Sequence, residues 1–221
     1  MDRLAVTGSF VAQFCALGVL YSSGLYIPQI QEAFDCSRAS AAQIPSLITS
    51  SMLLSALGAG AAFDRYFALI IKARPGEPSY SMFLPLVIGC ILTSLGLFLL
   101  SISDSITTAC FASLPIGAGC AIFALPAITV VQSWYDDSSR ATATGLAMAG
   151  SGVGNFTFAI VLQSVIERHG FRAALRREAL FVLVVSSLGS ALIWRKGVDV
   201  KGKEVAGQVT AESAVMEDEM R

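Results

Sequence analysis

The side chains of this chain that could do chemistry are few and uncharged within its long apolar runs. No Asp, Glu, Lys, Arg or His lies in the central part of any run, so the sequence offers no titratable group for a proton relay. The polar candidates are Tyr21, Ser22, Ser23 and Tyr26 in the first run, and Asn155, Thr157 and Gln163 in the fifth. Hydroxyls of this kind typically bond to their own helix, and tyrosines typically form an interfacial belt. Asn155 is the strongest exception, because a buried amide needs a partner.

Two prolines in the fourth run indicate interruptions of a helix. Pro115 and Pro126 each remove one backbone hydrogen bond and crowd the carbonyl four residues earlier, on Phe111 and Ile122 respectively. A freed carbonyl is tolerated where it meets protein or lines a wet cavity. Interrupted helices of this kind occur in transporters, and they also occur as simple kinks.

The fifth run contains a set of glycines: Gly145, Gly150, Gly152 and Gly154. Their spacing, GSGVG, does not match the dinucleotide fingerprint GxGxxG, and no strand pattern precedes it, so nucleotide binding is set aside. Small residues four apart instead predict a flat helix face for close packing. The second run repeats this spacing in the pairs Ala56–Gly60 and Gly58–Ala62.

Enzyme chemistry has no support in the sequence. The five cysteines form no CxxC pair, and His169 is a single histidine, so we expect neither a metal site nor a disulfide framework. We find no nucleophile–base pair and no cofactor loop, and we therefore expect no enzyme and no cofactor. The net charge of -1 argues against nucleic acid as a partner.

Composition and run length predict an all-α, polytopic membrane protein embedded in the lipid bilayer. The chain is 54% hydrophobic and 14% charged, with a mean hydropathy of +0.67. Runs near 20 residues are long enough to cross a bilayer. The spans we expect within a bundle of residues 1–195 are 4–28, 41–63, 82–103, 108–133, 141–166 and 173–194.

The last span and the tail need separate comment. Arg176, Arg177 and Glu178 precede the apolar part of the last span, which crosses only if these side chains snorkel to the interface. Five helices are the alternative to six. Residues 196–221 are polar throughout and are predicted to be a disordered cytosolic tail.

The distribution of Lys and Arg favours both termini in the cytosol. With that orientation, ten of the 15 basic residues lie on the cytosolic side, and the remainder lie outside. The loop between the fifth and sixth spans is an unexpected basic patch on the outer side. Nothing in the sequence distinguishes the plasma membrane from an organelle membrane.

The segment WYDDSSRATATGLAMAGSGVGNF, followed by GFRAAL, resembles the fourth-to-sixth helix region of the monocarboxylate transporter family, within the major facilitator superfamily. GAGAAFDRY, with Asp64 and Arg65, is similar to the loop motif of that superfamily. The matching positions of the first segment are Trp134, Tyr135, Arg140, Ala143, Gly145, Ala147, Gly150, Ser151, Val153, Gly154, Gly170, Phe171 and Arg172. Acid-carrying members have a lysine in helix one, which this chain lacks.

The resemblance implies the N-terminal six-helix half of a carrier that moves a small organic solute, monocarboxylate-like or another metabolite, by alternating access. Tyr21, Ser22, Tyr26, Pro115, Pro126 and Asn155 are then the pathway candidates. Asp64, Arg65 and Arg140 would gate the cytosolic loops, and the glycines with Arg172 would serve helix packing. Such a half would need a second half or a homodimer. A truncated, non-transporting fragment and a regulatory subunit that pairs with another carrier are the alternatives.

Overall fold

The computed structural model describes residues 3–73, 78–135 and 137–193, apart from the side chains of residues 3, 59, 61–83, 130, 133, 134 and 137. The described part of the chain folds into helices and short connections. The helices are α1 (Arg3–Ser22), the 3-10 turn η1 (Ser23–Tyr26), α2 (Ile27–Phe34), α3 (Arg38–Ala73), α4 (Pro78–Ser101), α5 (Ile106–Trp134) and α6 (Asp137–His169). A further helix over residues 171–193, which we call the last helix, completes the bundle.

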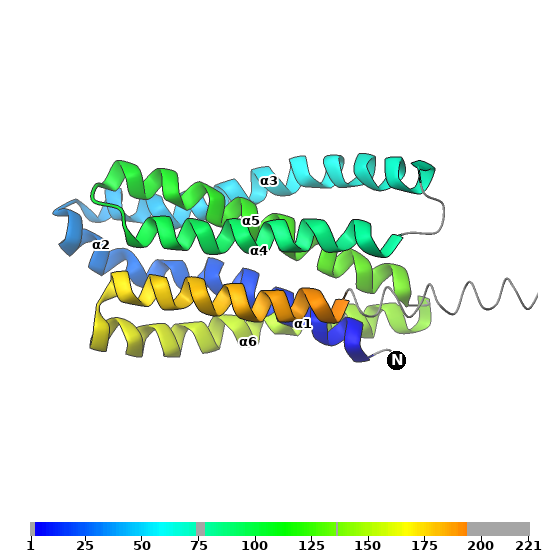
Figure 1. Ribbon diagram of the computed structural model, residues 1–221. Coiled ribbons are helices and arrows are strands. Elements are labelled where there is room, and N and C mark those ends of the chain that lie inside the picture. Colours follow the sequence, from blue (N-terminus) through cyan, green and yellow to red (C-terminus); the bar gives the residue numbers. More distant parts are fainter. Residues whose placement is uncertain (1–2, 74–77, 136, 194–221) are drawn as a thin grey trace, which may run out of the picture.

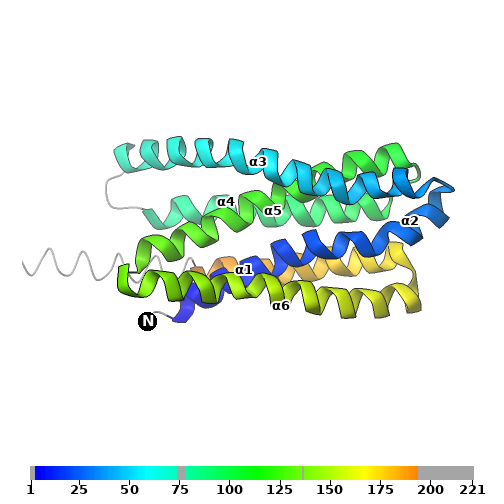
Figure 2. The same ribbon diagram turned by 180° about the vertical axis from the view of Figure 1, so that it is seen from behind.

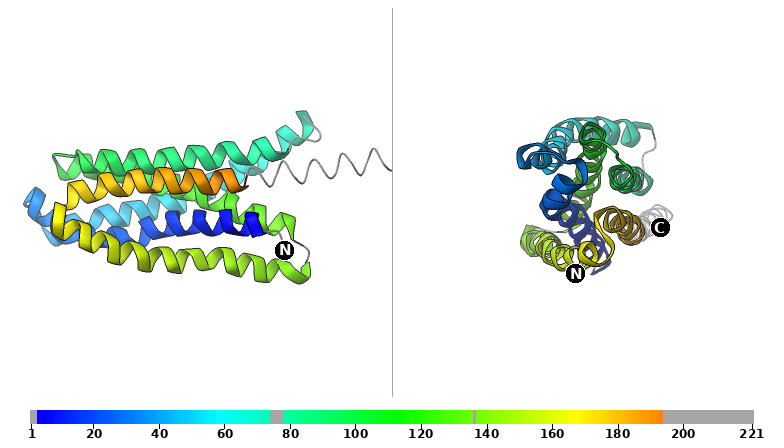
Figure 3. Two further views of the ribbon diagram at one scale, coloured as in Figure 1. Left: turned by 60° about the horizontal axis from the view of Figure 1, so that its bottom comes forward. Right: turned by 90° about the vertical axis from the view of Figure 1, so that its left-hand side faces the viewer.

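The long helices run side by side along one axis (Figures 1 and 2). Seen end-on, they form one bundle (Figure 3), in which α1 packs on α6 and α5, and α5 also packs on α3 and α4. The α6–last helix turn and the α2–α3 turn lie at the end opposite the N-terminus. This arrangement confirms the predicted all-helical fold.

Five helical segments of the described residues are long and apolar enough to cross a membrane: Leu4–Phe34, Arg38–Gly58, Leu84–Ser101, Ile106–Thr129 and Ser138–His169. The last helix lies alongside them but carries Arg172, Arg176, Arg177 and Glu178 in its first turns. The protein is therefore an integral, multi-pass membrane protein, and the predicted tail over residues 196–221 lies outside the described residues.

Several helices extend beyond the predicted spans. The first continues through η1 and α2 to Phe34 and ends where Asp35 adopts a left-handed φ of 46°. The turn expected at WYDDSSR is much shorter, because α5 ends at Trp134 and α6 begins at Asp137. Hydropathy marks only the part of a helix inside the hydrocarbon, so polar turns at helix ends are missed.

Polar capping and one glycine determine two of the connections. The Ser105 side chain accepts from the Thr108 backbone N–H, and the Thr108 side chain accepts from the Ser105 N–H, which is a capping box at the start of α5. Between α6 and the last helix, Gly170 has a φ of 78°. Glycine adopts this conformation without steric cost, so the chain reverses there within one residue.

Close helix contacts depend on glycines, and only part of the predicted set takes part. A Cβ at Gly150 or Gly154 would collide with the backbone of Phe10 or Phe14 on α1. A Cβ at Gly145 or Gly152 would meet nothing within 4 Å. Gly145 and Gly152 lie on the side of α6 opposite to Gly150 and Gly154, because their spacing from that pair places them on another face of the helix.

The glycines of the second predicted span make no close helix contact within the described residues. A Cβ at Gly58 or Gly60 would meet nothing within 4 Å. The contact of α3 with α5 is made instead by Gly117, where a Cβ would collide with the backbone of Ile48. At the contact between α3 and α5, the small residue is therefore Gly117 of α5 and not a glycine of α3.

Gly154→Ala should destabilise the bundle by about 1–3 kcal/mol, because the new methyl group has no room against the Phe14 backbone. Gly152→Ala, two residues away in the same helix, should be neutral or stabilising by up to about 1 kcal/mol, because alanine favours helix and the site is open. Denaturant unfolding in mild detergent, followed by circular dichroism, measures both. Equal effects of the two substitutions would contradict the packing described here.

Candidate functional site

A buried hydrogen bond joins the first and last membrane segments. The Tyr26 hydroxyl donates to Oε2 of Glu178 at 2.6 Å, and each residue is only 3% exposed. The second carboxylate oxygen, Oε1, has no partner among the described residues. A buried carboxyl group needs such a partner, because burial without hydrogen bonds is costly.

The snorkelling expected for Glu178 is therefore wrong, although its two neighbours do reach the surface. Arg176 and Arg177 are exposed. Buried positions of the last helix include Ala174, Leu175 and Ala179, which lie four, three and one positions from Glu178. Successive side chains of a helix are rotated by about 100° about its axis, so Glu178 points in a different direction from the two arginines before it.

Glu178 lines two cavities, and the one that Tyr26 also lines is too small for a solute. This smaller cavity has a volume of about 10 Å³ and is lined by residues that include Val19, Ile44, Leu97 and Leu175. These side chains come from α1, α3, α4 and the last helix. The Tyr26–Glu178 pair thus lies where four helices meet, and within this bundle it links them together.

Two further polar side chains of α1 lie deep in the bundle. Ser9 Oγ donates to the carbonyl of Ala127 at 2.6 Å, and Gln13 Nε2 donates to the carbonyl of Ala124 at 3.0 Å. Both donors are buried, at 0% and 1% exposure. They are four residues apart on one face of α1, which is the signal that the sequence analysis missed. Their acceptors flank Pro126 on α5.

The region of Pro126 therefore meets protein within the described bundle. Pro126 is buried and Pro115 is partly buried, and α5 is continuous through both prolines. Side-chain donors from α1 reach carbonyls beside Pro126, in keeping with the rule that irregular backbone at membrane depth needs partners.

The other pathway candidates do not converge. Tyr21 is 60% exposed, whereas Ser22 is buried and bonds back to the Val19 carbonyl at 3.3 Å. Asn155 is exposed on α6, so the expectation of a buried amide does not hold within this bundle. Tyr26 has Glu178 as its partner. The six candidates thus divide between the interior and the outer surface of the bundle.

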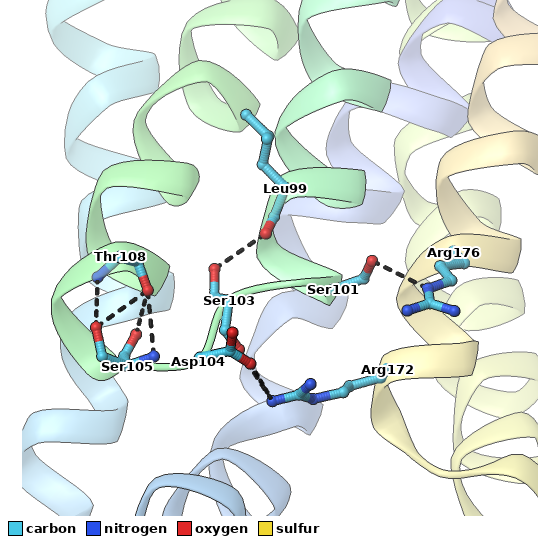
Figure 4. A network of polar contacts seen from close by, with 8 residues as sticks. All are labelled: Leu99, Ser101, Ser103, Asp104, Ser105, Thr108, Arg172 and Arg176. Carbon is cyan, nitrogen blue, oxygen red and sulfur yellow. Dashed lines mark hydrogen bonds and ion pairs between the residues drawn. The ribbon is translucent and has the colours of Figure 1, made fainter.

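Arginines at the start of the last helix tie it to the α4–α5 turn (Figure 4). Arg172 Nη2 donates to the Ser103 carbonyl at 3.0 Å and forms an exposed ion pair with Asp104 at 3.4 Å. Arg176 Nε donates to Ser101 Oγ at 3.4 Å. Arg172, predicted as part of a packing motif, instead connects helix ends.

The predicted gating residues are described only in part. Arg140 Nε donates to the Tyr135 carbonyl at 3.2 Å and so links the first turn of α6 to the connection before it. Asp64 and Arg65 lie within α3, and their side chains fall outside the described part of the chain.

Several helices present large apolar side chains outward, and α3 and α6 are among them. On α3, Leu53, Leu54 and Leu57 are 63%, 70% and 76% exposed. On α6, Phe156 is 70% exposed, and the same helix carries the open Gly145 and Gly152. These surfaces suit contact with lipid or with other membrane helices.

Buried helix seams and outward apolar faces define a helical membrane bundle of the kind found in transporters. The family model described as Major Facilitator Superfamily matches residues 10–216, and the chain belongs to that superfamily. The family resemblance expected from the sequence is confirmed.

Relatives of known name agree with this membership. The chain is 31% identical to monocarboxylate transporter 12-B of Danio rerio over 86% of this chain and 37% of that protein. It is 29% identical to the fujikurins efflux protein of Gibberella fujikuroi over 94% of this chain and 42% of that protein. The chain thus spans about two fifths of the length of each.

Among solved structures, the peptide transporter POT in complex with alafosfalin shares the fold. The TM-score is 0.69 at 14% sequence identity, over 96% of this chain and 44% of that one. At this identity the likeness concerns the fold alone.

Tyr26→Phe should lower the free energy of unfolding by about 1–3 kcal/mol, because Glu178 loses its hydroxyl donor while remaining buried. Tyr21→Phe is the matched control: its ring is largely exposed, and no change is expected. The same measurements in a Glu178→Leu background, which has no acceptor for the Tyr26 hydroxyl, complete a double-mutant cycle. An additive cycle would show that the two side chains do not interact energetically.

Proposed function

We propose that this chain forms one six-helix half of a carrier that moves a small organic solute by alternating access. The observation that carries the proposal is the apolar outward surface of α3 and α6, with open glycines on both helices. Superfamily membership supports the same reading, because carriers of this kind consist of two six-helix halves around a central site. A second half, or a second copy of this chain, would cover that surface.

The pathway residues of this proposal are the exposed polar ones. Asn155 and Tyr21 have no place in the interior of this half, and a second bundle would enclose them beside the solute. Tyr26 and Ser22 would support the pathway from within. Asp64, Arg65 and Arg140 would act as cytosolic gates, and we propose that both termini are cytosolic.

We propose the class of solute from the names of the relatives that this chain matches. A transporter named for monocarboxylates and an efflux protein named for fujikurins both match this chain. Both names indicate small organic compounds. We therefore propose a monocarboxylate or a related metabolite as the cargo. A regulatory subunit that covers the same surface on another carrier is the second candidate, and it would associate without transport.

Gly152→Trp should abolish both association and solute uptake, because the bulky ring would block close approach of a second bundle at α6. Leu188→Trp is the control, since Leu188 is 61% exposed on the last helix, away from the proposed contact. Size analysis in mild detergent measures association, and uptake of radiolabelled monocarboxylates into liposomes measures transport.

Each outcome of that experiment has a defined meaning. Association and uptake that are lost together in Gly152→Trp and kept in Leu188→Trp support the carrier. Association without uptake of any solute supports the regulatory subunit. Purified protein that moves no solute in any oligomeric form overturns the transport proposal.

A further inference from the structure

A cavity of about 280 Å³ lies in the seam between α6 and the last helix. Its apolar lining includes Val161, Leu162 and Val165 of α6, and Ala174 and Phe181 of the last helix. Val161 and Phe181 are 52% and 46% exposed, so the cavity reaches the outer surface of the bundle. Such a surface faces lipid in a membrane protein.

Aromatic rings in tilted and edge-to-face contact lie at the inner side of the seam. The ring centroid of Phe158 lies 5.5 Å from that of Phe14 and 5.8 Å from that of Phe181. Aromatic pairs at these separations are favourable and rigid. The cavity is therefore closed toward α1 and accessible from the lipid side.

Basic side chains lie at the polar end of the cavity. Arg177 lines it and is exposed, and its Nη1 lies 3.0 Å from Nδ1 of His169. Arg168, also exposed, directly precedes His169. Arg172 and Arg176 contact the α4–α5 turn instead.

The acidic groups near this end are fewer than the basic ones, although the exposed carboxylate of Glu167 keeps its negative charge. Glu167 Oε1 accepts a hydrogen bond from Gln163 at 2.7 Å, and Asp104 pairs with Arg172. Glu178 also lines the cavity, but its carboxylate is buried and bonded to Tyr26. Positive charge therefore predominates where the cavity meets the membrane surface.

These basic residues belong to the end of α6 and the start of the last helix, and the turn between the two helices lies at the end of the bundle opposite the N-terminus (Figure 1). If the termini are cytosolic, this is the side on which short loops ordinarily carry few Lys and Arg. An anionic group bound by these guanidinium groups would account for their concentration there.

We propose that the seam between α6 and the last helix binds one anionic phospholipid. An acyl chain would occupy the apolar cavity, since a dry, apolar space open to lipid favours an apolar occupant. The phosphate would lie against Arg177 and Arg168, because guanidinium groups bind phosphate through charge-assisted, bidentate hydrogen bonds.

Thermal unfolding of the full chain in nanodiscs tests this proposal. Discs of phosphatidylcholine alone are compared with discs that contain phosphatidylglycerol, and native mass spectrometry counts the phospholipids retained after release. We expect a higher unfolding temperature with phosphatidylglycerol and one retained phosphatidylglycerol per chain. Glycerol 3-phosphate, which has the phosphate but no acyl chain, should give neither effect.

Two variants and a control test the two parts of the site. Arg168→Gln combined with Arg177→Gln should remove at least half of the phosphatidylglycerol shift. Val161→Trp should do the same by filling the cavity from its exposed side. Arg38→Gln removes a charge from the start of α3, at the same end of the bundle but outside the cavity lining, and should keep the full shift.

The unfolding temperature in phosphatidylcholine alone shows whether each variant is folded. An equal loss in Arg38→Gln would overturn the proposal in favour of a general surface-charge effect. A full shift and full retention in folded Val161→Trp would overturn the assignment of the acyl chain to this cavity. The measurement involves no transport, so it is independent of the proposed carrier function.

Discussion

The close approach of helix backbones at glycine is the constraint on which the rest of this bundle depends. In a bilayer, apolar side chains gain little by leaving lipid for protein, so association rests on packing and interhelical hydrogen bonds. Gly150 and Gly154 place α6 directly on the backbone of α1. On another side of α1, Gly8 and Gly189 bring the last helix equally close. Without side chains at these points, α1 fits between its two neighbours.

Buried polar bonds accompany this packing. Ser9 and Gln13 reach carbonyls of α5, on which α1 also packs. The Tyr26–Glu178 bond needs the last helix to lie beside the end of the first membrane segment. A polar group at this depth has no water to bond to, and each of these hydrogen bonds supplies a partner instead. Close packing and hydrogen bonding of the buried polar groups therefore occur together.

The sequence predicted the all-helical membrane fold, because bilayer thickness determines the length of an apolar run. It did not predict how each helix is rotated about its axis. Gly145, Gly150, Gly152 and Gly154 are equivalent by composition, yet the structure places two in contact with α1 and two in the open. Glu178 was misjudged for the same reason. It follows two surface arginines in the chain, and only the tertiary partners of the last helix determine that it points inward.

The glycines of α3 and α6 that meet no neighbour within this bundle indicate what covers these two helices. A glycine in a helix costs up to about 1 kcal/mol relative to alanine, and this cost is offset only where another backbone comes close. Gly58, Gly60, Gly145 and Gly152 meet nothing within this bundle. Lipid chains adapt to a methyl group as readily as to a hydrogen atom, so a lipid neighbour gives no reason for glycine there. A second helical bundle does give one, and it would place its own helices against these positions as closely as α6 lies against α1.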